Sequence, residues 1–78
     1  MMEKLSKGDK VIITLASREI EGLVILSSGN SKSLMLTFDA FFGGYVGMMP
    51  LLYDDTAQAY RDLIENRIIK VKKADGKQ

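Results

Sequence analysis

The predicted fold depends on residues 54–65, DDTAQAYRDLIE, where the spacing of apolar side chains changes. Earlier in the chain apolar and polar residues mostly alternate, whereas here apolar residues recur at helical spacing. These are Ala57, Tyr60, Leu63 and Ile64. Asp54-Asp55 before the stripe and Asn66 after it are residue types that favour helix caps. The pattern therefore predicts one short helix, from Thr56 to Glu65, which would close one end of a small barrel.

The rest of the chain is predicted to form strands, because β-branched or alternating runs are separated by turn signals. The expected strands are Lys10–Leu15, Ile20–Leu26, Ser33–Ala40, Tyr45–Met49 and Ile68–Lys73. Gly22, in the middle of the second, predicts a sharp bend or bulge. The fold class is thus mainly β: a small barrel of about five antiparallel strands with one short α-helix before the last strand. Residues 1–73 are expected to form a single domain and residues 74–78 a disordered tail.

Three segments resemble the SH3-like small barrels, a group that includes Sm-like and Tudor domains. They are Gly8-Asp9-Lys10-Val11, Glu19-Ile20-Glu21-Gly22-Leu23-Val24 and Leu34-Met35-Leu36-Thr37-Phe38-Asp39. With Gly44-Tyr45-Val46-Gly47, they also look like the N-terminal barrel of archaeal tRNA-dependent amidotransferase subunits. The resemblance implies a barrel that binds a partner, and it leaves the ligand open.

The composition excludes several classes of chemistry. The chain has no cysteine and no histidine, so it cannot build disulfides, the usual zinc sites or Ser-His-Asp triads. Asp54 and Asp55 form the only adjacent carboxylate pair and could in principle hold Mg²⁺, but a cap is the favoured role. We therefore predict a protein that is not an enzyme, with no catalytic residue, no metal site and no cofactor.

Targeting signals are also missing from the pattern. The first residues turn polar too early for a secretory signal. The longest apolar region, Phe41 to Tyr53, is interrupted by glycines and falls short of the roughly 20 residues that cross a bilayer. These features predict a cytoplasmic protein with no membrane partner.

The same apolar region suggests a binding surface. It contains more large apolar side chains than one strand face can bury, namely Phe41, Phe42, Tyr45, Met48, Met49 and Tyr53. Exposed apolar groups often mark partner surfaces, and methionine adapts to varied contacts. The leading hypothesis is a protein-interaction or self-association module that uses this group, with Phe42 and Met49 expected to point outward. Part of the group is also needed to fill the core.

A second hypothesis concerns nucleic acid. Lysines open and close the chain, and the first and last strands of small barrels often lie together. Lys10, Lys70, Lys72 and Lys73 could then form a patch which, beside Tyr45 or Phe42, would bind single-stranded nucleic acid. With a formal net charge of +1, lysines that simply protect an edge strand explain the same pattern.

Overall fold

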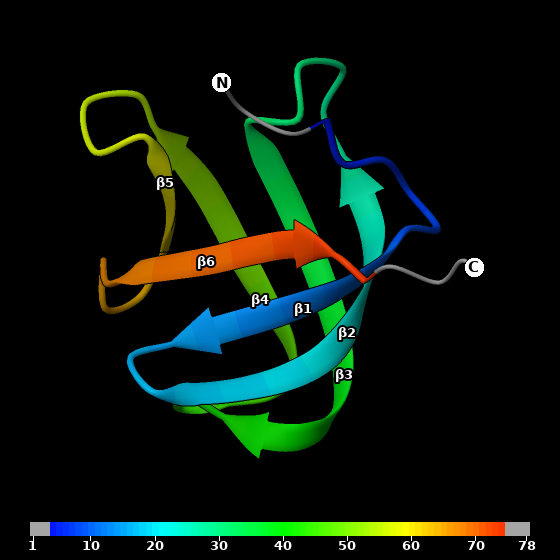
Figure 1. The fold of residues 1–78 in the computed structure, drawn as a ribbon, viewed down its shortest axis with the longest axis vertical. Coiled ribbons are helices and arrows are strands. Elements are labelled where there is room, and N and C mark those ends of the chain that lie inside the picture. Colours follow the sequence, from blue (N-terminus) through cyan, green and yellow to red (C-terminus); the bar gives the residue numbers. More distant parts are fainter. Residues whose placement is uncertain (1–3, 75–78) are drawn as a thin grey trace.

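The structure, a computed structural model, describes residues 4–74 as a closed antiparallel barrel (Figure 1). The strands of this described part are β1 (Lys10–Leu15), β2 (Arg18–Ser27), β3 (Ser33–Phe42), β4 (Tyr45–Asp54), β5 (Ala59–Asp62) and β6 (Ile68–Lys73). Each pairs with the next along the chain, and β6 returns to pair with β1. The predicted mainly β barrel is confirmed, with six strands instead of about five. The predicted tail lies outside the described residues from residue 75 onward.

The core follows from the alternation of side chains along the strands. Val11 and Ile13 of β1 face inward, as do Leu34, Leu36 and Phe38 of β3, so these predicted core positions are confirmed. The other buried hydrophobic residues are Leu5, Val24, Phe42, Tyr45, Met49, Leu51, Tyr60 and Ile69. Full burial stabilises each large aliphatic or aromatic side chain by about 1.5–3 kcal/mol relative to exposure. One cluster therefore holds the barrel together.

The segment before β1 covers this core beside the β2–β3 turn. Leu5 is buried, and its N–H donates to the Ser31 hydroxyl at 3.0 Å. Its carbonyl accepts hydrogen bonds from the hydroxyls of Ser27 and Ser31, at 2.6 and 2.8 Å. Ser31 is itself buried, so its polar group is satisfied by these bonds. Leu5 occupies a position for which the sequence had suggested no role.

The predicted helix from Thr56 to Glu65 was wrong, since the described residues contain no helix and β5 lies in its place. Tyr60 faces the core as expected, but Leu63 and Ile64 are 54% and 71% exposed. An isolated helix of this length is only marginally stable in water. A strand here instead supplies backbone hydrogen-bonding partners for the two strands beside it. β5 pairs with β4 on one side and with β6 on the other, and so completes the ring of backbone hydrogen bonds.

The hairpin of β3 and β4 is longer than predicted. β3 continues to Phe42 and β4 continues to Asp54, with Pro50 in register with Met35. The chain reverses at Gly43-Gly44, where both residues have positive φ, and this turn pairs Phe42 with Tyr45. Both rings are buried as a result.

The expected bend at Gly22 corresponds to a close approach between strands. A Cβ atom at Gly22 would lie 2.6 Å from Ile13 Cδ1 and 2.9 Å from the Thr37 carbonyl oxygen. The latter is backbone and cannot rotate away, so any larger residue would push β3 outward. The β2–β3 register also shifts nearby, between Val24 and Leu26.

Candidate interaction face on β3 and β4

The predicted partner-binding group divides between the core and the surface. Phe41 and Met48 are 66% and 52% exposed, whereas Tyr45 is buried. The prediction that Phe42 and Met49 point outward was wrong, because neither has any exposed surface. The Gly43-Gly44 turn fixes this pattern, since pairing Phe42 with Tyr45 turns Val46 and Met48 outward and Met49 inward. Tyr53 is half-buried, with its ring edge against Tyr60 at a centroid distance of 5.2 Å.

Part of the outward surface of the hairpin is uncharged, and we call this part the β3–β4 face; Asp39 and Asp54, which also point outward, lie beside it. It consists of Met35 and Thr37 on β3 and of Val46, Met48, Pro50 and Leu52 on β4. Thr37 lies opposite Met48, and Met35 lies opposite Pro50. Val46 and Leu52 are 79% and 48% exposed. Such a run of unpartnered apolar groups on one sheet is typical of an interaction surface.

Two exposed leucines extend the β3–β4 face sideways. Leu26 of β2 is opposite Met35, and the N–H of Leu63, just after β5, donates to the Pro50 carbonyl at 3.3 Å. Between these four residues the surface is hollowed, with a volume of about 420 Å³. The apolar area therefore crosses from β2 to the end of β5.

Ion pairs neutralise the charges at one edge of this face. The Asp54 carboxylate accepts from Arg61 Nε at 2.7 Å, and Lys32 Nζ lies 2.8 Å from Asp55. Asp54 also accepts the N–H groups of Thr56 and Ala57, so it caps a turn and not the predicted helix. The hydrogen bond from Arg61 makes the largest contribution to lowering the Asp54 pKa, and the hydrogen bond from the Ala57 N–H lowers it further. Within residues 4–74 no cluster of three potential metal-ligating side chains is found.

The terminal lysines meet on the other side of the barrel. Because β1 pairs with β6, Lys10, Lys70 and Lys72 share its outer surface. Lys73 is in register with the inward-facing Val11, and its Nζ lies 3.8 Å from the Asp9 carboxylate.

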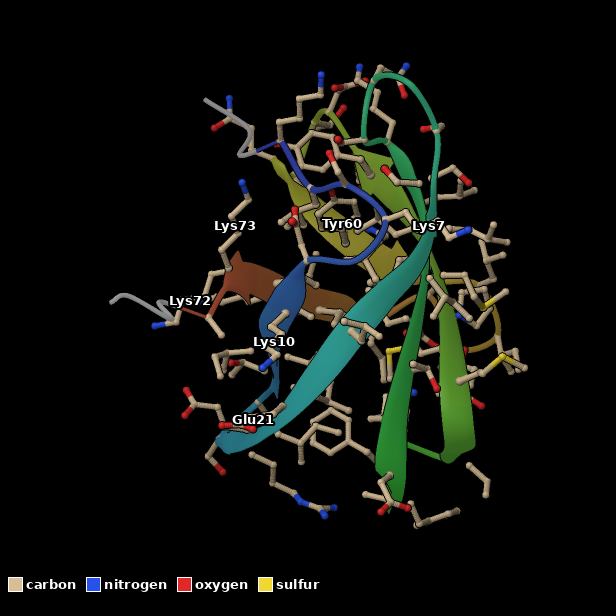
Figure 2. All side chains as sticks on the ribbon, turned by 90° about the vertical axis from the view of Figure 1, so that its right-hand side faces the viewer. Lys7, Lys10, Glu21, Tyr60, Lys72 and Lys73 are labelled. Atoms are coloured by element: carbon tan, nitrogen blue, oxygen red, sulfur yellow. The ribbon has the colours of Figure 1, made fainter. Side chains whose placement is uncertain are left out.

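Acidic residues accompany these lysines, and aromatic residues do not. Glu19 and Glu21 of β2 lie opposite Thr14 and Ile12, on the same surface as Lys10 and Lys72 (Figure 2). Phe42 and Tyr45, proposed as stacking platforms, are both buried. Three of the four lysines predicted to form the patch, Lys10, Lys70 and Lys72, therefore share one surface, but this surface is mixed in charge and has neither of these rings.

Sequence reasoning gave no role to Asp62, whose side chain is fully buried. Its carboxylate accepts the Tyr45 hydroxyl at 2.8 Å, the N–H groups of Glu65 and Arg67 at 2.9 and 2.7 Å, and the Arg67 guanidinium at 3.3 Å. Burial alone raises the Asp62 pKa, but these hydrogen bonds outweigh it and lower the pKa to about 2. Burial and the bond to Asp62 raise the pKa of the Tyr45 hydroxyl.

This network is structural. Arg67 Nη2 also donates to the Gly43 carbonyl at 2.6 Å, so Asp62 and Arg67 tie the β5–β6 turn to the β3–β4 turn. Both oxygens of the carboxylate accept hydrogen bonds from protein donors. The sequence carries no signal for this role, because Asp62 lies outside the predicted helical stripe and its burial depends on Arg67 and Tyr45 beside it.

Comparisons with family models, with curated proteins and with solved structures find no match for this chain. The part of the chain that the structure describes contains no helix long and apolar enough to cross a membrane. What the geometry establishes for the described residues is a small six-stranded antiparallel β-barrel with a group of uncharged outward side chains on β3 and β4.

Proposed function

We propose that this chain is a non-enzymatic binding module of the SH3-like barrel type, which self-associates through its β3–β4 face. One observation carries the proposal: six neighbouring outward side chains of β3 and β4 are uncharged, between the carboxylates of Asp39 and Asp54, and they are flanked by Leu26 and Leu63. A second copy is the partner that fits best, because the neighbouring Asp54 and Asp55 already have cationic partners. The face itself therefore offers no charge to a charged partner, and the carboxylate of Asp39, which has no ion-pair partner among the described residues, lies outside it, two residues beyond Thr37.

A two-fold arrangement makes this face self-complementary. Met48 lies midway between Val46 and Pro50 along β4. A two-fold axis beside Met48, in the plane of the interface and perpendicular to the strands, would place Val46 of each copy over Pro50 of the other. The most exposed side chain of the face would then enter the hollow beside Leu26 and Leu63.

The size of the face sets the expected affinity. Four strands spaced about 4.8 Å apart, and about 20 Å of strand length, give a projected area of about 400 Å². A standard interface contributes about 800 Å² per partner. We therefore expect a weak dimer, with a dissociation constant of about 10–100 µM.

Sedimentation velocity from about 1 µM to about 1 mM tests the proposal. The unsubstituted chain is expected to move from monomer to dimer over this range. Met48→Lys should raise the dissociation constant at least tenfold, because it places a charge at the centre of the interface. Lys72→Glu, on the opposite side of the barrel, is the matched control and should change it by less than about twofold. A chain that remains monomeric throughout, or equal effects of the two substitutions, would overturn self-association.

The nucleic-acid alternative has one supporting observation, the shared surface of Lys10, Lys70 and Lys72. Glu19 and Glu21 on the same surface oppose it, because carboxylates repel phosphate. Titration with single-stranded RNA and DNA at low salt distinguishes the two ideas. Salt-dependent chemical-shift changes along β6 would favour this alternative.

A further inference from the structure

β2 and β3 separate before either strand ends. Their pairing stops at Leu23 and Thr37, although β2 begins at Arg18 and β3 continues to Phe42. Figure 2 shows the two ribbons diverging downward from this point. The surface is hollowed here, with a volume of about 670 Å³, and residues of both strands line the hollow. We call it the β2–β3 cleft.

The backbone of β2 presents hydrogen-bonding groups to this cleft. The Val24 N–H donates to the Asp9 carbonyl at 2.9 Å, and the Val24 carbonyl accepts from the Gly8 N–H at 2.8 Å. Backbone groups of an antiparallel strand point alternately to its two sides. Gly22 therefore faces β1, and the N–H and carbonyl of Glu21 face the cleft. No residue of β3 is in register with Glu21, so this edge resembles that of an unfinished sheet.

The side chains of the cleft combine an apolar wall with carboxylates. Leu23 and the ring of Phe38 supply apolar surface, and Glu21 and Asp39 supply two carboxylates. Neither carboxylate has an ion-pair partner among the described residues. Among residues 4–74, Lys10 is the only cationic side chain that lines the hollow, so this part of the lining has a net negative charge.

We propose that the β2–β3 cleft binds an extended peptide segment that pairs with the Glu21 backbone and places a lysine or arginine beside Glu21 and Asp39. An added strand would use the N–H and carbonyl that Glu21 directs into the cleft, as in β-strand addition. The carboxylates select a cationic partner and disfavour nucleic acid. This inference does not rest on self-association, because Thr37 is the one residue that the β3–β4 face and the lining of the cleft share.

The probe is the capped pentapeptide Lys-Val-Lys-Val-Lys, followed by ¹⁵N chemical shifts at low salt. We expect shifts at Glu19 to Leu23 and at Asp39, and slower hydrogen exchange of the Glu21 amide. Glu-Val-Glu-Val-Glu should not bind. Reversing both carboxylates, Glu21→Lys with Asp39→Lys, should weaken binding roughly fivefold, as expected for the loss of two surface ion pairs.

A backbone-methylated form of the cationic peptide separates strand addition from simple charge attraction. It keeps the charges but loses the N–H donors that face β2, so it is expected not to bind. Equal binding of the methylated peptide, equal binding of the acidic peptide, or no binding of the cationic peptide would each overturn the proposal. Self-association through the β3–β4 face is measured separately by sedimentation, so either proposal can fail alone.

Discussion

Phe42→Ala is expected to lower the free energy of unfolding by about 3–5 kcal/mol, the range for phenylalanine deletions in packed cores. The Phe42 ring is fully buried, packs edge-on against Phe38 at a centroid distance of 6.2 Å and lies 5.4 Å beneath the Arg18 guanidinium. A domain of this size is stable by only about 4–12 kcal/mol. The variant should therefore be partly unfolded at room temperature, which urea denaturation followed by circular dichroism would measure.

The adjacent residue provides the control. Phe41 is chemically identical and largely exposed, so Phe41→Ala should cost less than about 0.5 kcal/mol. The pair of variants measures the orientation of β3 directly, because only the side of the sheet differs between them. Similar losses of stability in both variants would show that the inward position of Phe42 is wrong.

Asp62→Ala is expected to destabilise the protein by a similar amount, about 3–5 kcal/mol at neutral pH. The substitution leaves the Tyr45 hydroxyl and the N–H groups of Glu65 and Arg67 without their buried acceptor. Asp55→Ala removes a carboxylate whose side chain is 69% exposed and should cost less than about 1 kcal/mol. Urea denaturation of the two variants at pH 7 makes the comparison.

The pKa of Asp62 also gives the stability a defined pH dependence. In the folded protein this pKa is about 2, below the ordinary value of 3.8. The ionised form therefore stabilises the folded state above pH 3.8, and this contribution is lost as the pH falls from about 4 through about 2. Its size is roughly 2 kcal/mol. Asp62→Asn should flatten the stability curve over this interval, and an unchanged slope would contradict the assigned pKa.

The sequence predicted the parts of the fold that one-sided burial determines. β1 and the first half of β3 carry β-branched or leucine residues at every second position, so their inward faces could be predicted although Ile12 and Met35 interrupt the alternation. Closure of the barrel by β1 and β6 followed from the order of the strands. Asn66 was expected in the left-handed conformation, and it has a φ of 59° although it ends a turn and not a helix.

β5 could not be recognised because its inward face is polar in part. Tyr60 and Asp62 are the inward pair, and a buried aspartate does not look like a core residue until Arg67 and Tyr45 are known to surround it. Leu63 and Ile64 completed an apparent helical stripe, although they are exposed in the turn that follows β5. Local spacing therefore favoured a helix, and pairing with two neighbouring strands decided the outcome.

The candidate face was predicted as a region and not by its individual residues. Phe42 and Met49 were expected to point outward and are buried, whereas Phe41 and Met48 of the same group are exposed. The division between Met48 and Met49 depends on the register that the Gly43-Gly44 turn imposes, and a shift of one residue would exchange them. Leu26 and Leu63 join the face only through strand pairing, which the sequence order alone does not reveal.

The order of the strands also has a kinetic consequence. Every pair of neighbouring strands except β1 and β6 is also consecutive in sequence. Forming these hairpins therefore closes only short loops, whereas pairing β1 with β6 closes a loop that spans the other four strands. We expect the hairpins to form early in refolding and the β1–β6 seam last. In pulse-labelling experiments β6 amides should gain protection after those of β3 and β4, and simultaneous protection would contradict this order. During synthesis on the ribosome, β1 would wait with one edge unpaired until β6 emerged.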